Sequence, residues 1–167
     1  ENLGVTDDFG IPRVKGVSFS VRAGEIVGIA GVAGNGQSEL LESVSGMRDQ
    51  KSGTVRLKGT PLSLEGDDGA ARARAAGLAH VPEDRLRMGL VTNFSEWENT
   101  ILGYQGSYGK GLALDIEQAR RTADEYIQKF DIRPPNKDLK TANFSGGNQQ
   151  KIVLAREMER NPDVLIV

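Results

Sequence analysis

The stretch "GVAGNGQSEL", residues 31–40, lies between an apolar segment and a run of residues with helical spacing. It matches the phosphate-binding loop pattern G-x-x-x-x-G-K-[ST] at Gly31, Gly36 and Ser38, but Gln37 stands at the lysine position. Glycines let such a loop curl until several backbone N–H groups converge on a phosphate, and the following helix N-terminus adds partial positive charge. With the lysine missing, the loop alone is equally compatible with a tight strand-to-helix turn that binds no ligand.

The flanking sequence predicts alternating strands and helices. "IVGIAG", residues 26–31, is an apolar run typical of a strand buried on both faces, and "SELLESVSGM", residues 38–47, predicts a helix that ends near Gly46. Further strands are expected over residues 17–21, 52–59 and 78–82, and an alanine-rich helix over residues 67–77. This order favours an α/β fold around a mainly parallel sheet.

The second half of the chain is predicted to be mostly helical. Ser95 and Glu98 have the spacing of a capping box, and residues 106–112 are glycine-rich and expected to form a mobile loop. The next segment predicts an amphipathic helix with one apolar stripe, formed by Ile116, Ala119, Ala123, Ile127 and Phe130. A proline-marked connection, another helix and a final strand at "PDVLIV" complete the chain, and residues 88–142 resemble an inserted helical subdomain.

Composition limits the classes of function. The chain has 167 residues, enough for one domain with a hydrophobic core, of which 38% are hydrophobic and 26% charged. A net charge of −2 gives no electrostatic case for binding nucleic acid, and no apolar run has the length of a membrane-spanning helix. Cysteine is absent, which excludes disulfides and thiolate metal sites. Because the chain starts at Glu1 and stops inside the apolar run "VLIV", we expect it to be an excised piece of a longer protein.

A second motif, "FSGGNQQK" at residues 144–151, has a coherent physical interpretation. Ser145 can cap the helix that follows, and Gly146 and Gly147 allow an anion to approach the backbone at the positive end of that helix. Taken alone, the motif is also compatible with a serine-capped helix led by flexible glycines. Together with the loop at Gly31, it resembles the signature motif of the ATP-binding-cassette (ABC) ATPases, whose common form is LSGGQ.

The resemblance covers nearly the whole chain. It implies an α/β P-loop NTPase core with an antiparallel β lead-in and an inserted helical subdomain, divided as core 1–87, helical subdomain 88–142, and signature helix with the start of the Walker B strand 143–167. The stretches "GNGQSEL", "HVPEDR" and "FSGGNQQK" are more narrowly similar to the C-terminal cassette of the tandem ATPases of bacterial monosaccharide and nucleoside importers.

This resemblance implies ATP and Mg²⁺ as cofactors and assigns residues to them. Ser38 and Glu83 are the candidate metal ligands, and Phe9 is the candidate for stacking on adenine, with a hydrophobic staple in the first hairpin as the alternative. The remaining candidate nucleotide-binding residues come from the two glycine-rich motifs: Gly31, Val32, Ala33, Gly34, Asn35, Gly36, Gln37, Ser38, Glu39, Ser145, Gly146, Gly147, Asn148 and Gln149.

The departures from the family pattern weaken the expected chemistry. Gln37 is neutral and predicts weaker triphosphate binding than lysine, and Glu83 stands where most cassettes have the Q-loop glutamine. The family's Walker B aspartate, catalytic glutamate and switch histidine would lie beyond Val167. The single histidine, His80, is expected to be structural. No catalytic residue is therefore intact, and we expect this chain alone not to hydrolyse ATP.

The family geometry implies a role for the signature motif in an ATP site whose Walker A lies on a second cassette. The expected partners are that cassette and transmembrane permease subunits, at the cytoplasmic face of the membrane, with no nucleic acid and no direct membrane insertion. Trp97, Ile101 and Tyr104 form either an exposed face that docks a permease subunit or a stripe of the hydrophobic core. Residues 83–85 form either a segment that faces the permease or a solvated cluster of charges. The alternatives for the whole are a competent ATPase cassette when full-length, and a structural fragment that binds nothing.

Overall fold

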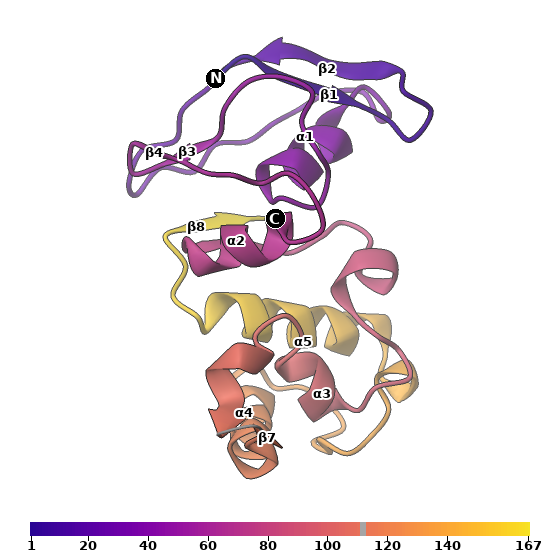
Figure 1. Ribbon diagram of the computed structural model, residues 1–167. Helices are drawn as coiled ribbons and strands as arrows, with labels where there is room; N and C mark the ends of the chain where they lie inside the picture. The colour runs from indigo at the N-terminus through magenta and orange to yellow at the C-terminus, as the bar shows by residue number, and fades with distance from the viewer. Residues whose placement is uncertain (111–112) are drawn as a thin grey trace. The chain divides into compact units, whose positions relative to one another are not determined.

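The computed structural model describes residues 1–110 and 113–167, which form two compact units (Figure 1). The first comprises residues 1–78 with Ile166, and the second comprises residues 79–165 with Val167. The loop predicted at residues 106–112 lies partly outside the described residues. Within the described part, η2 (Gln105–Tyr108) is a short 3₁₀ turn that leads into the antiparallel pair β6 (Gly109–Lys110) and β7 (Ala113–Leu114).

The first unit is built on an antiparallel hairpin and one helix. Strand β1 (Leu3–Thr6) pairs with β2 (Pro12–Val17), and α1 (Gln37–Val44) packs against both (Figure 1). A second hairpin joins β3 (Arg56–Leu57) to β4 (Thr60–Pro61), and α2 spans Gly69–Ala75. The buried apolar side chains of this unit include Leu3, Val5, Val14, Leu40 and Leu64.

Helix α1 ends where the sequence predicts. Gly46 adopts a left-handed conformation with φ 74°, and its N–H donates to the Ser43 carbonyl at 3.1 Å. The Met47 N–H donates to the Glu42 carbonyl at 2.8 Å. These two bonds form a Schellman motif, which satisfies the last carbonyl groups of the helix and fixes its length.

The predicted buried strand at residues 26–31 is wrong in this structure. Residues 25–30 have no regular secondary structure, and the side chain of Ile26 is 97% exposed. The strand pairs found among the described residues are β1–β2, β3–β4, β6–β7 and β5 (Leu78–His80) with β8 (Val164–Ile166). None of them includes residues 26–31, so this segment has no ladder to bury it, and the described strands form short pairs in place of one parallel sheet.

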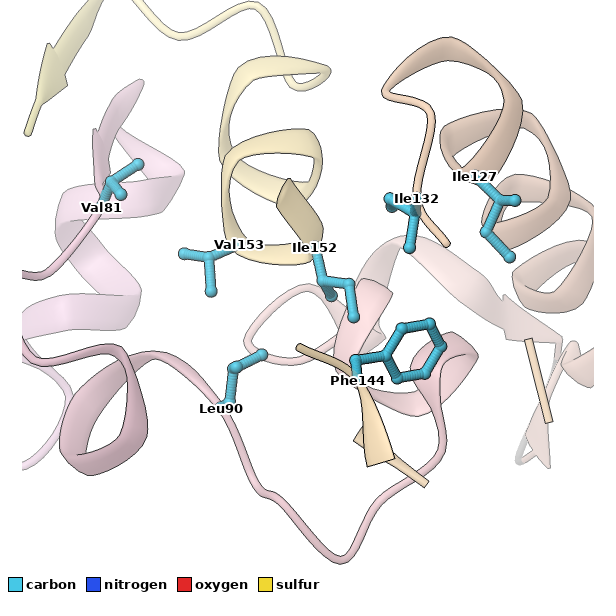
Figure 2. Close-up of a cluster of buried hydrophobic side chains, with 7 residues drawn as sticks. All are labelled: Val81, Leu90, Ile127, Ile132, Phe144, Ile152 and Val153. Carbon is cyan, nitrogen blue, oxygen red and sulfur yellow. The ribbon is translucent and has the colours of Figure 1, made fainter. Parts of the chain in front are cut away.

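The second unit is held by a helical core. Helices α3 (Glu96–Thr100), α4 (Ile116–Lys129) and α5 (Gly146–Met158) pack on one another, and η3 spans Thr141–Asn143. Figure 2 shows the main cluster of buried side chains, to which α5 contributes two: Val81, Leu90, Ile127, Ile132, Phe144, Ile152 and Val153. This cluster fixes α5, and with it the segment "FSGGNQQK", in the second unit.

The predicted stripe on α4 is largely confirmed. Ala119, Ala123 and Ile127 are buried, and Phe130 packs against the cluster. Ile116 is the exception, with 49% of its surface exposed, because it is the first residue of the helix and lies beyond the packed turns.

The capping box at the start of α3 is confirmed, and it supports a prediction. The Glu98 carboxylate accepts hydrogen bonds from the Ser95 N–H at 2.8 Å and from the Ser95 hydroxyl at 2.6 Å. Ser95→Ala is expected to lower the free energy of unfolding by about 1 kcal/mol. Urea denaturation would measure this, with the exposed Ser107→Ala as control. Equal effects of the two substitutions would contradict the capping role.

Candidate functional site

The glycine loop needs glycine at two positions for different reasons. Gly34 and Gly36 both have positive φ, 84° and 100°, and Gly36 is the N-cap residue of α1. A Cβ atom on Gly36 would lie 2.7 Å from the Arg13 carbonyl oxygen, so the loop passes β2 too closely for any side chain. The loop thus closes directly onto the N-terminus of α1, as the pattern predicts.

Gln37 folds back across this loop. Its Nε2 donates to the Val32 carbonyl at 3.1 Å, and a Cβ atom on Gly31 would collide with the same amide group. The Asn35 N–H donates to the Val32 carbonyl at 3.2 Å and closes the turn. The side chain at the lysine position is therefore bonded to the loop itself.

The other predicted residues of the loop lie around this turn. Val32, Ala33, Gly34 and Asn35 are exposed, and Val32 is 73% exposed although it is apolar. Ser38 is exposed and Glu39 is half-buried, both in the first turn of α1, and the metal-ligand role of Ser38 stays a prediction.

The sequence analysis did not identify Arg13, which lies on β2 and contacts the glycine loop. Its Nη1 lies 3.5 Å from the Gly34 carbonyl oxygen, and its Nε donates to the Asp7 carboxylate at 2.8 Å. The N–H of Ile11 also donates to Asp7, at 2.9 Å, and this bond is the largest of the contacts that lower the Asp7 pKa. Only the register of the β1–β2 hairpin brings Arg13 to the loop, so no local sequence signal marks it.

Phe9 lies at the tip of the same hairpin and is 90% exposed. Its N–H donates to Asp7 at 3.0 Å, which fixes the backbone and leaves the ring in solvent. The hydrophobic staple considered for this residue is therefore wrong, because the ring is not packed. Stacking on adenine stays a prediction.

The signature segment begins with a serine cap, as expected. Ser145 has extended backbone, and its hydroxyl oxygen accepts from the Asn148 side-chain amide at 2.9 Å and from the Asn148 N–H at 3.5 Å. The Asn148 Oδ1 accepts from the Arg133 N–H at 2.8 Å. Asn148 is thus fixed from two sides, while Ser145 stays exposed.

The remaining signature residues differ from one another. Gly147 is exposed and has open space where a Cβ atom would project, whereas a Cβ atom on Gly146 would lie 2.6 Å from the Arg85 Nη2. Gln149 is 7% exposed, and its Nε2 donates to the Thr141 carbonyl at 3.0 Å. The predicted Gln149 side chain is therefore engaged inside the second unit.

The segment after β5 folds into η1 (Arg85–Gly89), a single π-helical turn. The Asp84 carboxylate caps it by accepting from the N–H groups of Leu86 and Arg87, both at 3.1 Å. Glu83 and Asp84 are exposed, while Arg85 is half-buried against α5. Neither expectation for residues 83–85 included this packing.

Two further sets of predicted residues can be placed. His80 is half-buried in β5. Ile101 is buried with Trp97 packed beside it, and the Tyr104 hydroxyl donates to Glu157 at 2.6 Å, so this stripe belongs to the core and the docking face is wrong. Among the described residues no group of three or more histidine or acidic side chains could hold a metal ion.

Both glycine-rich segments, before α1 and at the start of α5, lie within a region that matches a known protein family. The family model described as "ABC transporter" matches residues 14–167. This chain belongs to the ABC transporter family. The ABC chain contains no helix, in the part that the structure describes, that is long and apolar enough to cross a membrane.

Curated relatives of this ABC chain are import ATP-binding proteins. It is 41% identical to the guanosine import ATP-binding protein NupO of Bacillus subtilis over 99% of this chain and 32% of NupO. It is 38% identical to the nucleoside import ATP-binding protein NupA of Lactococcus lactis, over 100% of this chain and 33% of NupA. The ribose import ATP-binding protein RbsA of Clostridium perfringens is 37% identical over 92% of this chain and 30% of RbsA. The chain spans about a third of the length of these relatives.

Solved structures confirm the predicted fold class. The dimeric ATP-binding cassette MJ0796, in a post-hydrolysis state bound to ADP and Pi, aligns with a TM-score of 0.79 and 24% identity, over 99% of this chain and 70% of that one. A further dimeric structure of MJ0796 aligns with a TM-score of 0.78 and 23% identity, over the same shares of the two chains. The ABC chain therefore has the α/β P-loop NTPase fold of these cassettes.

Proposed function

We propose that this chain is the ATP-binding module of a bacterial nucleoside or sugar importer, placed as the C-terminal cassette of a tandem ATPase. The observation that carries the proposal is the N-terminus of α5, where Ser145 caps the helix and Gly147 is exposed with open space beside it. The names of the relatives support import of nucleosides or sugars. The expected partners are permease subunits and a second cassette, at the cytoplasmic face of the membrane.

In this proposal α5 completes an ATP site whose phosphate loop belongs to the second cassette. The N–H groups at the start of a helix and its partial positive charge favour an anion, and the glycine at position 147 lets a phosphate approach the backbone. Gly146 and Gln149 contribute less directly, because Arg85 and Thr141 already engage them.

The chain's own loop fits a nucleotide phosphate, but weakly. Gly34 and Gly36 have the positive φ angles that a cradle of backbone N–H groups requires, and Ser38 stands where its hydroxyl would meet Mg²⁺. ATP would supply the phosphate anion, and Mg²⁺ would offset its charge. Gln37 adds no positive charge, and its amide must leave the Val32 carbonyl before it can donate to a phosphate. The loop is therefore expected to bind a nucleotide phosphate more weakly than a loop with lysine at this position, and we call it the detuned site.

This reasoning predicts that Gln37→Lys tightens ATP binding about tenfold. The Gln37 amide can only donate a neutral hydrogen bond to a phosphate, whereas lysine adds a full positive charge beside it, and an additional stabilisation of about 1.4 kcal/mol is a factor of ten in Kd. Titration calorimetry of ATP and ADP with Mg²⁺ would measure the change. The gain should be larger for ATP than for ADP, since lysine reaches the β- and γ-phosphates.

The control for this experiment is Gln128→Lys, which adds the same charge on the exposed face of α4. It should leave both dissociation constants unchanged. If neither the original chain nor Gln37→Lys binds ATP, the loop is only a turn and the detuned site is refuted. If the control tightens binding equally, the effect comes from net charge.

A further inference from the structure

We infer that Arg85 is a positioning residue, which latches the η1 turn onto the first turn of the signature helix α5. Its Nε lies 3.4 Å from the Gln149 Oε1, and its Nη2 lies 2.6 Å from the point where a Cβ atom on Gly146 would project. The guanidinium therefore covers the Cα of Gly146. The backbone of Gly146 does not itself require glycine, because its φ lies outside the positive region, but any Cβ atom there would displace the end of the Arg85 side chain.

The rest of η1 follows the same face of α5. A Cβ atom on Gly89 would lie 3.3 Å from the Val153 Cγ2, and the Arg156 Nη1 donates to the Gly89 carbonyl at 2.9 Å. Gln149, Val153 and Arg156 are spaced by four and three residues, so they lie on one stripe of the helix. The turn is thus attached to α5 at both ends, by Arg85 at the signature and by Arg156 two turns later.

The charge of Arg85 indicates that its position does not serve helix stability. A cation beside the first turn of a helix is opposed by the partial positive charge of that end, where acidic side chains are the favourable ones. Local rules of this kind are broken mainly at functional sites. Arg85 instead attaches the exposed segment at Glu83 and Asp84 to Gly146. A displacement of this segment would therefore move the Arg85 side chain, which lies beside the signature glycine.

A double-substitution cycle tests the latch directly. Gly146→Ala is expected to displace the Arg85 guanidinium and so to lower the midpoint of urea unfolding in the original chain by the contribution of the Arg85 contacts, and to lose that effect in the Arg85→Ala background. Gly147→Ala is the matched control, since open space surrounds it, and it should not lower the midpoint in either background. An equal shift from Gly146→Ala in both backgrounds overturns the latch.

A second measurement covers the case in which Gly146→Ala does not fold. In ¹⁵N–¹H spectra, Arg85→Ala should shift the side-chain amide resonances of Gln149, whereas the control Arg87→Ala should not. Arg85→Lys should resemble Arg85→Ala, because lysine has no Nε donor and no planar fork to lie on Gly146. Unshifted Gln149 resonances in Arg85→Ala also overturn the latch.

The consequence for ATP rests on the proposed function and needs its own readout. In the intact transporter, Arg85→Ala is expected to raise the KM for ATP several-fold with a smaller change in kcat, because the signature would be misplaced for binding. If Arg85→Ala leaves the KM unchanged while the double-substitution cycle still shows coupling between Arg85 and Gly146, the proposed role of the signature is refuted and the contact between Arg85 and α5 is supported. Absence of the coupling refutes the latch whatever the KM.

Discussion

Arg156→Ala is expected to lower the free energy of unfolding of the second unit by about 3–5 kcal/mol, the cost of leaving one charge of a buried ion pair uncompensated. Arg156 is 3% exposed and Glu157 1% exposed, and the Arg156 Nε donates to the Glu157 carboxylate at 2.8 Å. The same guanidinium donates to the carbonyl oxygens of Gly89, at 2.9 Å, and Asn99, at 3.2 Å. Alanine removes all of these donors and fills little of the space.

Urea denaturation followed by circular dichroism would measure this loss. The control is Arg121→Ala, because that side chain is 65% exposed and pairs with Glu117 at 3.7 Å. An exposed pair of this kind contributes about 0.2–1 kcal/mol at most. A loss below about 1 kcal/mol for Arg156→Ala would show that the Tyr104 hydroxyl, which also donates to Glu157, is sufficient to satisfy the buried carboxylate.

Local sequence signals predict the parts of the fold that depend on neighbours in the chain. The cap at Ser145, the capping box at Ser95 and the stop at Gly46 each depend on residues within four positions, and all three are confirmed. The buried stripe of α4 follows from helical periodicity in the same way.

The strand expected at residues 26–31 fails for the opposite reason. An apolar run becomes a buried strand only when distant segments supply hydrogen-bond partners on both sides. The residues of the run itself do not indicate whether those partners exist. In the described structure the other strands pair among themselves, and Ile26 and Val32 remain in solvent.

The residues of the candidate site also differ in whether the local sequence can predict them. The two glycine-rich motifs could be found from their spacing alone, because the backbone conformations that they need are local. Arg13 and Arg85 could not, since each reaches its glycine across a tertiary contact: Arg13 beside Gly36 and Arg85 beside Gly146. Gln149 shows that a residue can belong to a sequence motif and still be buried, since its side chain donates to the Thr141 carbonyl inside the second unit.

Glu96 is the second residue whose substitution should have a large effect. It is fully buried in α3, where one carboxylate oxygen accepts from the Thr100 hydroxyl at 2.8 Å. The other oxygen, Oε2, has no hydrogen-bond partner in the part of the chain that the structure describes. Burial, assisted by the nearby Asp124 carboxylate, raises the pKa of Glu96 from its ordinary 4.5 to about 7, against the opposing effects of the Thr100 hydrogen bond and of Lys137.

The direction of the pH dependence follows from proton binding. Between pH 4.5 and 7 the folded chain keeps the proton on Glu96 while the unfolded chain has lost it, so this residue makes stability fall as the pH rises through that range. Above about pH 7 both states are ionised and the loss is complete, at about 3 kcal/mol, since one pKa unit corresponds to about 1.4 kcal/mol.

Glu96→Gln is therefore expected to stabilise the second unit by about 3 kcal/mol at pH 8 and by close to nothing at pH 4.5. Glutamine keeps an oxygen for the Thr100 hydroxyl and carries no charge to bury. Urea denaturation at intervals across this range would measure the difference between the two curves, with Glu125→Gln, an exposed carboxylate on α4, as the matched control. A constant difference across the whole range would mean that Glu96 does not titrate there, and that the substitution acts through packing alone.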